Sequence, residues 1–159
     1  MTFSQSNEDK IISEIFAEIG VTNKRFVEFG CGDGRQNNTI ALLHQGWSGI
    51  WLEPHRRRCN SAKERFAGFP VDIRRRIVTP RNVNKIVADP LDFLSIDIDG
   101  NDHDVWEALT AKPRVVCIEY DAINGSPLAR MHGLGFAKGY TLVRCSASGV
   151  NAFFVRTDQ

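Results

Sequence analysis

Three glycines at alternate positions follow an apolar segment in FVEFGCGDG, residues 26–34. Gly30, Gly32 and Gly34 tolerate positive φ and let a ligand approach the backbone closely, as in nucleotide-binding turns between a strand and a helix. Glu53 ends the next apolar segment, GIWLEP, 19 residues after Gly34. A carboxylate at this distance suits a pair of ribose hydroxyls. The pattern predicts a site for an adenosine-bearing ligand, and the alternative is an ordinary tight turn between a strand and a helix.

The charges near this loop select among adenosine ligands. The dinucleotide fingerprint G-x-G-x-x-G fails, because its sixth position counted from Gly30 is Arg35. Asp33 lies in the loop and Glu28 just before it, and a carboxylate about 4 Å from a pyrophosphate would cost a few kcal/mol in a partly buried site. The same carboxylates favour an ammonium and a sulfonium. We therefore expect S-adenosylmethionine rather than NAD or FAD.

A second group of carboxylates follows the apolar run in LDFLSIDIDGND, residues 91–102. Strand alternation predicts that Asp97 and Asp99 share one face. A calcium-binding EF-hand loop counted from Asp97 is excluded, since its sixth position is Asp102 and its twelfth is Ala108.

Four roles remain open for these carboxylates. They orient the methionine part of the ligand, deprotonate an acceptor, or bind a divalent metal together with Glu119 or Asp121 of the next strand. The fourth role is a plain polar turn in which Asn101 or Asp102 caps the following helix.

Short apolar runs alternate with longer amphipathic segments, which predicts a β-α-β-α order. Ser6 and Asp9 resemble a capping box before the first helix. Strands are expected at 25–30, 48–53, 73–78, 91–97, 114–120, 140–145 and 152–156, and helices at 7–19, 36–45, 55–67, 83–87, 102–109 and 126–138.

Such an order builds an α/β, Rossmann-like fold, because each crossover lays a helix on a parallel sheet. We expect a seven-stranded, mostly parallel sheet with helices on both faces and an antiparallel hairpin at the C-terminal end. The ligand should lie at the carboxyl ends of the strands, where the strand order reverses.

Length and composition set the frame for these elements. The 159 residues, 42% hydrophobic and 25% charged, predict one globular domain over residues 1–159. No apolar run is long enough to span a bilayer, and the polar, acidic N-terminus does not resemble a signal peptide. The four scattered cysteines form neither a zinc motif nor a disulfide framework, and reduced thiols indicate a cytoplasmic protein.

The charge is unevenly distributed along the chain. Nine Lys and Arg face two acids between residues 55 and 81, a net charge of +7, so the rest carries −6 of the total +1. A solvated face is the simpler interpretation of such a run, and an anionic partner the alternative.

The sequence also resembles a known family at six segments that occur in order over nearly the whole chain. SQSNEDKIISEIF, FVEFGCGDGRQNNT, GWSGIWLEP, DFLSIDIDGND, VVCIEYD and GVNAFFVR are similar to the FkbM-type branch of the class I S-adenosylmethionine-dependent methyltransferases. The resemblance implies strand order 3-2-1-4-5-7-6 and methyl transfer to a hydroxyl of a sugar or small metabolite. It carries one departure: DAINGSPLARMHG leaves little room for the long insertion after the fifth strand that normally forms the acceptor pocket.

The resemblance assigns roles to individual residues. The glycine loop would contact the methionine part, Glu53 and Pro54 would bind the ribose, and the turn after the third strand would contact the adenine. Asp97 and Asp99 would lie beside the sulfonium or accept the proton. Two N-terminal residues would close over the cofactor. The implied cofactor-binding residues are Gln5, Asp9, Glu28, Gly30, Cys31, Gly32, Gly34, Asn38, Glu53, Pro54, Asn82, Val83 and Asp97, with Asp97 and Asp99 catalytic.

Three further hypotheses stay beside this one. The short segment after the fifth strand favours a large acceptor, a second chain that completes the site, or a non-catalytic module that binds S-adenosylmethionine or S-adenosylhomocysteine. A metal-assisted O-methyltransferase would use Asp97 and Asp121, although no metal is expected. A nucleic-acid methyltransferase would use the basic patch of residues 56–81. The NPPY-like motif for amino methylation is absent after the fourth strand, so an oxygen acceptor is preferred over a base nitrogen. A small-molecule or glycan acceptor is therefore expected, and no membrane partner.

Overall fold

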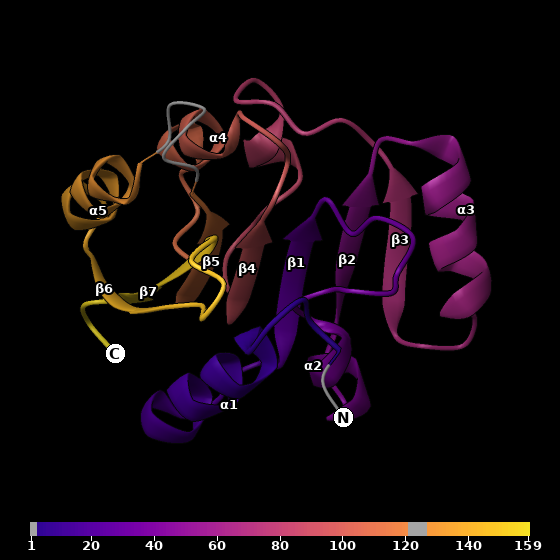
Figure 1. The fold of residues 1–159 in the computed structure, drawn as a ribbon, viewed down its shortest axis with the longest axis horizontal. Coiled ribbons are helices and arrows are strands. Elements are labelled where there is room, and N and C mark those ends of the chain that lie inside the picture. The colour runs from indigo at the N-terminus through magenta and orange to yellow at the C-terminus, as the bar shows by residue number, and fades with distance from the viewer. Residues whose placement is uncertain (1–2, 121–126) are drawn as a thin grey trace.

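A computed structural model describes residues 3–120 and 127–159, which form one seven-stranded sheet of order β3-β2-β1-β4-β5-β7-β6 (Figure 1). Strands β1 to β5 pair in parallel, whereas β7 is antiparallel to both β5 and β6. The strands are β1 (Arg25–Phe29), β2 (Ser48–Glu53), β3 (Val71–Arg75), β4 (Phe93–Ile96), β5 (Val115–Glu119), β6 (Tyr140–Cys145) and β7 (Asn151–Arg156). The predicted Rossmann-like architecture is confirmed.

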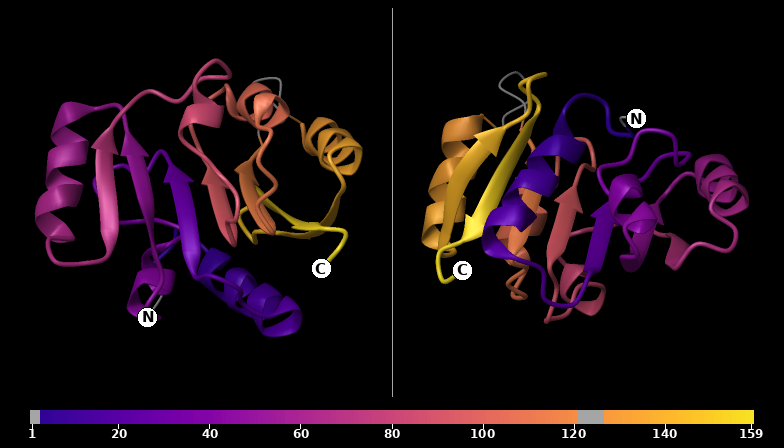
Figure 2. Two further views of the ribbon diagram at one scale, coloured as in Figure 1. Left: turned by 180° about the vertical axis from the view of Figure 1, so that it is seen from behind. Right: turned by 90° about the horizontal axis from the view of Figure 1, so that it is seen from below.

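Helices cover both faces of the sheet (Figure 2). They are α1 (Glu8–Ile19), α2 (Ile40–His44), α3 (Arg56–Arg65), the 3₁₀ turn η1 (Val83–Lys85), α4 (Asp102–Ala108) and α5 (Leu128–Ala137). Helices α1, α2 and α3 contribute to one hydrophobic core, and η1, α4 and α5 to the other. No helix of the described residues is long and apolar enough to cross a membrane.

Alternation along the strands divides their side chains between the two cores. In β1, Phe26 packs in the core of α1 to α3, and Val27 in the core of η1, α4 and α5. Trp51 and Trp106 are fully buried, one in each core. Because burial of a large apolar side chain contributes about 1.5–3 kcal/mol, both layers hold the sheet and hence its carboxyl edge in place.

The start of α1 differs from the capping box predicted for Ser6. Ser4 and Asp9 bond reciprocally instead: the Asp9 amide donates to Ser4 Oγ at 3.3 Å, and the Ser4 amide donates to Asp9 Oδ2 at 3.2 Å. Phe3 also donates its amide to Asp9 at 2.6 Å. Asp9 therefore orders the chain before the helix.

Among the remaining elements, β3 and α2 differ most from their predicted bounds. Strand β3 spans 71–75 rather than 73–78, because its partner β2 ends at Glu53, which pairs with Arg75. Helix α2 begins only at Ile40, because the residues before it bond elsewhere: the Asn38 amide donates to Glu28 Oε1 at 3.0 Å. Both shifts change which residues reach the carboxyl edge.

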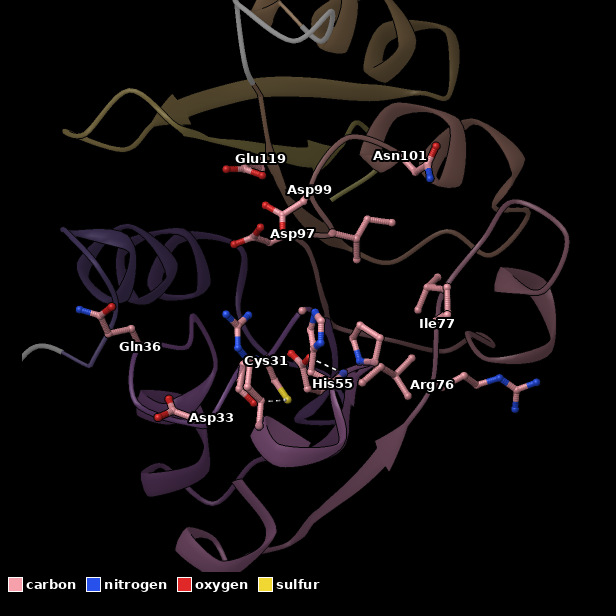
Figure 3. Close-up of a pocket in the computed structure, with 18 of the residues that line it drawn as sticks. Cys31, Asp33, Gln36, His55, Arg76, Ile77, Asp97, Asp99, Asn101 and Glu119 are labelled. Carbon is pink, nitrogen blue, oxygen red and sulfur yellow. Dashed lines mark hydrogen bonds between the residues drawn. The ribbon is translucent and has the colours of Figure 1, made fainter. Parts of the chain in front are cut away.

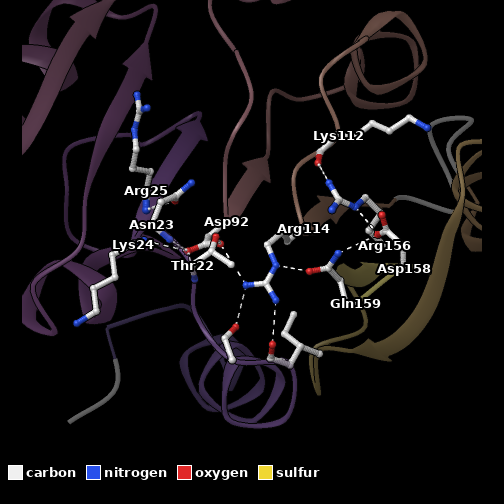
Figure 4. A network of polar contacts seen from close by, with 12 residues as sticks. Thr22, Asn23, Lys24, Arg25, Asp92, Lys112, Arg114, Arg156, Asp158 and Gln159 are labelled. Atoms are coloured by element: carbon white, nitrogen blue, oxygen red, sulfur yellow. Dashed lines mark hydrogen bonds and ion pairs between the residues drawn. The ribbon is translucent and has the colours of Figure 1, made fainter.

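The amino edge of the sheet is held by Asp92, which is fully buried (Figure 4). Its carboxylate accepts three consecutive amides, from Thr22 at 3.0 Å, Asn23 at 2.8 Å and Lys24 at 2.9 Å, and the Thr22 hydroxyl at 2.5 Å. Arg114 pairs with it at 3.2 Å and donates to the last carbonyls around α1. This network joins α1, β1, β4 and β5.

Candidate functional site

A cleft of about 1050 Å³ opens at the carboxyl ends of β1, β2 and β4, where the strand order reverses (Figure 3). It lies where the sequence predicted a ligand. Its lining comes from the loop after β1, the end of β2 and the turn into α3, the turn after β3, the loop after β4 and the end of β5.

The three loop glycines are required for three different reasons. A Cβ on Gly30 would lie 1.7 Å from the Asp97 carbonyl oxygen, so this glycine lets the β1 and β4 loops meet. A Cβ on Gly34 would lie 3.0 Å from Phe66, against the segment that follows α3. Gly32, with φ of 56°, has no atom within 4 Å of that position and faces open space. Only Gly32 leaves room for a ligand.

Glu53 connects the end of β2 to the glycine loop. Its buried carboxylate accepts the Gly32 amide at 2.9 Å and the His55 amide at 2.7 Å. A carboxylate offers about four lone-pair sites, so two acceptor positions remain for other donors. Glu53 thus fixes the loop and keeps the capacity to bind a diol.

A buried polar network supports the loop from below. Glu28 accepts from the Asn38 amide and the Thr39 hydroxyl, and Asn38 donates to Ser95 at 3.0 Å. Trp51 Nε1 donates to the Thr39 hydroxyl at 2.7 Å. Burial raises the pKa of Glu28 to about 7, although hydrogen bonds from Thr39 and Asn38 oppose the shift. These residues position the loop without lining the cleft.

Three carboxylates meet at the other end of the cleft (Figure 3). Oxygens of Asp97, Asp99 and Glu119 all lie within 4.8 Å of one another. Strand alternation does not explain this, since β4 ends at Ile96 and Asp99 adopts a left-handed φ of 56°. Asp102 holds the turn by accepting the amides of Ile98 at 2.8 Å and Gly100 at 3.0 Å. Its bonds go to the turn before α4, and the N-cap residue Asn101 makes no side-chain cap bond, so the predicted helix cap is not formed.

Crowding perturbs the acidity of this carboxylate group. Burial first, and then repulsion from Asp97, raise the pKa of Glu119 to about 8. Burial also raises the pKa of Asp97 to about 6, while a hydrogen bond with Glu119 opposes the shift. The pair therefore shares one proton near neutral pH and carries one negative charge between its two carboxyl groups.

The structure brings together part of the predicted site. The predicted residues that line the cleft are Gln5, Gly30, Cys31, Gly32, Glu53, Pro54, Asp97 and Asp99. The predicted residues outside its lining are Asp9, Glu28, Gly34, Asn38, Asn82 and Val83. Asp121, the proposed metal ligand, lies outside the described residues.

The turn after β3 places both residues predicted to meet the adenine, Asn82 and Val83, outside the lining of the cleft. Asn82 holds this turn, accepting the Thr79 amide at 2.9 Å and donating to the Ile77 carbonyl at 2.9 Å, and Val83 is fully buried. Because β3 ends early, Arg76, Ile77 and Val78 line the cleft instead. Ile77 is an apolar side chain within the basic run, and it is 67% exposed. The sequence did not indicate its position at the cleft, because that position depends on where β3 ends.

Comparisons with known proteins identify the fold. No protein-family model and no curated protein matches the chain. Solved structures do: magnesium protoporphyrin IX methyltransferase from Synechocystis PCC 6803 with bound S-adenosylmethionine has a TM-score of 0.69 at 12% identity, over 94% of this chain and 78% of that chain.

Two further structures agree. A TehB-like S-adenosylmethionine-dependent methyltransferase from Corynebacterium glutamicum has a TM-score of 0.60 at 14% identity, over 96% of this chain and 89% of that chain. The bifunctional kinase-methyltransferase WbdD has a TM-score of 0.68 at 12% identity, over 95% of this chain but 39% of that chain. The chain has the fold of the class I S-adenosylmethionine-dependent methyltransferases.

Proposed function

We propose that the chain binds S-adenosylmethionine at the glycine loop and transfers its methyl group to a hydroxyl oxygen of a sugar or small metabolite, as an FkbM-type enzyme would. One observation carries the proposal. A single cleft joins an open glycine, Gly32, and a buried carboxylate with free acceptor capacity, Glu53, to a carboxylate group with perturbed pKa values.

The lining residues fit each part of this cofactor. The two remaining acceptor positions of Glu53 suit the ribose hydroxyls, and the exposed side chain of Ile77 offers an apolar surface for the adenine. The open space at Gly32 accommodates the methionine part. Asp99 places negative charge at the cleft, where an ammonium and a sulfonium require it.

The cofactor supplies an electrophilic methyl group, so the protein must align an acceptor and remove its proton. Asp97 is the base in this proposal: its carboxylate oxygen accepts the hydroxyl proton as the O–C bond forms and the S–C bond to the methyl group breaks, with S-adenosylhomocysteine as the leaving group. In this proposal Glu119 holds the proton shared with Asp97 and donates it in a hydrogen bond that orients the Asp97 carboxylate. Asp99 adds charge beside them.

A metal-assisted reaction is the second candidate, supported by three carboxylates whose oxygens lie within 4.8 Å of one another. A divalent cation held by Asp97, Asp99 and Glu119 would lower the pKa of the acceptor hydroxyl. Turnover that falls with a chelator and returns with Mg²⁺ supports this candidate. Turnover insensitive to the chelator supports Asp97 as an unassisted base.

Calorimetric titration with S-adenosylhomocysteine tests the cofactor assignment. Glu53→Ala should weaken binding roughly 10- to 150-fold, because charged hydrogen bonds to the ribose contribute about 1.5–3 kcal/mol. Gly32→Val should abolish binding by filling the open space and straining a left-handed backbone. Glu64→Ala, on the exposed face of α3, is the matched control and should bind like the wild type.

Circular dichroism of the same samples separates lost binding from lost folding. If NAD binds more tightly than S-adenosylhomocysteine, or if folded Gly32→Val retains its affinity, the cofactor assignment is wrong. Cofactor binding without turnover on any hydroxyl acceptor would indicate the non-catalytic binding module.

A further inference from the structure

The basic run of residues 55–81 covers α3, β3 and the turn after β3, and we call its cationic side chains the α3–β3 basic face. All nine of its cationic side chains are exposed, and eight of them are arginine. They are Arg56, Arg57, Arg58, Lys63, Arg65, Arg74, Arg75, Arg76 and Arg81. Arginine binds phosphate, sulfate and carboxylate groups in planar, two-point geometry, so this face suits oxyanions.

Few of these cations have partners within the described residues. Arg74 pairs with Asp72 at 2.5 Å, and Arg65 and Arg75 donate to backbone carbonyls. The other six side chains, at positions 56, 57, 58, 63, 76 and 81, make no hydrogen bond or ion pair there. The first turn of α3 has three arginines and no acidic residue. Positive charge is unfavourable there, because the N-terminus of a helix carries a partial positive charge. Helix stability therefore does not explain them.

Topology brings the two arginine clusters of this face to the cleft. Residues 56–58 follow β2 and residues 74–76 end β3, and these strands are parallel neighbours, so both clusters lie at the carboxyl edge. Arg58 and Arg76 line the cleft itself. Figure 3 shows Arg76 extending away from Asp97, Asp99 and Glu119, toward the outside.

The geometry points to an acidic oligosaccharide as the methyl acceptor, with its anionic groups on the α3–β3 basic face and its reacting hydroxyl at Asp97. This inference rests on the proposed function and narrows its acceptor. Three strand spacings, about 14 Å, separate β3 from β4, and ten residues of α3 add about 15 Å of surface. A single sugar does not span this distance, whereas a chain of sugars with repeated negative charges does.

The surroundings of the face favour a glycan over a nucleic acid strand. Proteins that hold single strands stack bases on exposed aromatic side chains. Among the described residues, Phe69 is the one large, exposed aromatic side chain near this face. Its ring packs against His44 and Phe66, with ring centroids 5.3 Å apart in each pair. Charge without a stacking surface fits an acidic sugar chain.

Fluorescence anisotropy with a labelled heparin-derived octasaccharide tests this inference on the full chain. It should bind at least about tenfold more tightly than a neutral dextran fragment of equal length, and its affinity should fall steeply with salt. Arg56→Ala/Arg57→Ala should weaken binding about tenfold, and Arg58→Ala/Arg76→Ala by more, since these residues join the face to the cleft.

Arg25→Ala/Lys85→Ala is the matched control, because it removes two exposed cations outside the basic run. It should change the affinity less than about twofold. An equal loss in the control, equal binding of the dextran, or tighter binding of single-stranded or duplex RNA of matched charge would overturn the inference.

S-adenosylhomocysteine titration of the same samples separates this inference from the proposed function. Arg56 and Arg57 do not line the cleft, so their double variant should keep cofactor affinity while it binds the octasaccharide about tenfold more weakly. A wild-type protein that binds the octasaccharide but not S-adenosylhomocysteine would refute the proposed function instead.

Discussion

The two edges of the sheet use buried carboxylates in opposite ways. At the amino edge, Asp92 is satisfied by three amides, a hydroxyl and Arg114 (Figure 4). At the carboxyl edge, Asp97 and Glu119 face each other and Asp99 rather than a cation. The first arrangement serves the fold. The second leaves charge unbalanced beside a cleft, as a site for a cationic ligand requires.

The largest expected effect lies at the amino edge. Asp92→Asn should lower the free energy of unfolding by about 3–5 kcal/mol, because it leaves Arg114 buried without its counter-ion and places an amide group among donors. Urea denaturation measures the loss. Asp158→Asn, which breaks an exposed pair with Arg156, is the control and should change stability much less.

The pH dependence of this effect has a defined sign. Burial acts to raise the pKa of Asp92, but hydrogen bonds from Thr22, Asn23 and Lys24 outweigh it, and the pKa lies below its ordinary value. Its contribution to stability is therefore complete above about pH 3.9, the unfolded value, and is lost as pH falls through the depressed folded value. A variant that matches the wild type at pH 7 would contradict the structural role.

The next effect concerns rate at the carboxyl edge. Asp97→Asn should lower methyl transfer to a sugar hydroxyl by about 100-fold or more while cofactor affinity is nearly kept, as loss of a general base does. Release of S-adenosylhomocysteine gives the rate and calorimetry the affinity. Lost affinity without a separable rate effect would make Asp97 a cofactor-binding residue, and no change in either would leave only a polar turn.

Sequence patterns predicted some residues of the carboxyl edge and missed the roles of others. The glycine loop, Glu53 and the sheet were predictable because strand-helix alternation and the glycine spacing are local signals. Asn82 and Val83, predicted to meet the adenine, lie outside the cleft lining, since the end of β3 depends on pairing with β2 and not on its own apolar residues. Glu28 and Asn38 carry polar side chains that serve a buried network, which spacing does not reveal.

The role of Asp92 could not be predicted from the sequence. Nothing near it in the chain indicates that an aspartate beside a strand binds residues 22–24, about 70 positions earlier, and Arg114. Likewise, Asp97 and Asp99 were expected to meet through strand alternation, yet they meet through a turn in which Asp99 is left-handed. Long-range pairing decides both cases.

A smaller effect follows from the proton shared at the carboxyl edge. The folded pKa of Glu119, about 8, exceeds the unfolded value of about 4.3, so its contribution to stability is complete below about pH 4 and is lost as pH rises through 8. The urea midpoint should fall from pH 5 to pH 8.5. Glu119→Gln should flatten this fall and raise the midpoint at pH 8.5, and an unchanged slope would contradict the shared proton.

The smallest effect compares the two non-glycine residues of the described chain with left-handed φ. Lys24, at 54°, lies at the amino edge and donates its amide to Asp92 at 2.9 Å, while Asp99, at 56°, lines the cleft. A non-glycine residue in the left-handed conformation destabilises the fold by about 1–2 kcal/mol. Replacement by glycine removes this cost but loses about 0.5–1 kcal/mol, because glycine gives up more backbone entropy on folding. Lys24→Gly and Asp99→Gly should therefore each stabilise the fold by up to about 1 kcal/mol.

Function should separate this pair. Lys24→Gly removes no group near the cleft, so its S-adenosylhomocysteine affinity should equal that of the wild type. Asp99→Gly removes a carboxylate that lies with Asp97 and Glu119. This variant should therefore be more stable than the wild type, but it should bind the cofactor more weakly or transfer the methyl group more slowly. Strain kept at Asp99 would then serve the ligand. Equal behaviour of both variants in binding and turnover would show that the left-handed turn at the cleft is only structural.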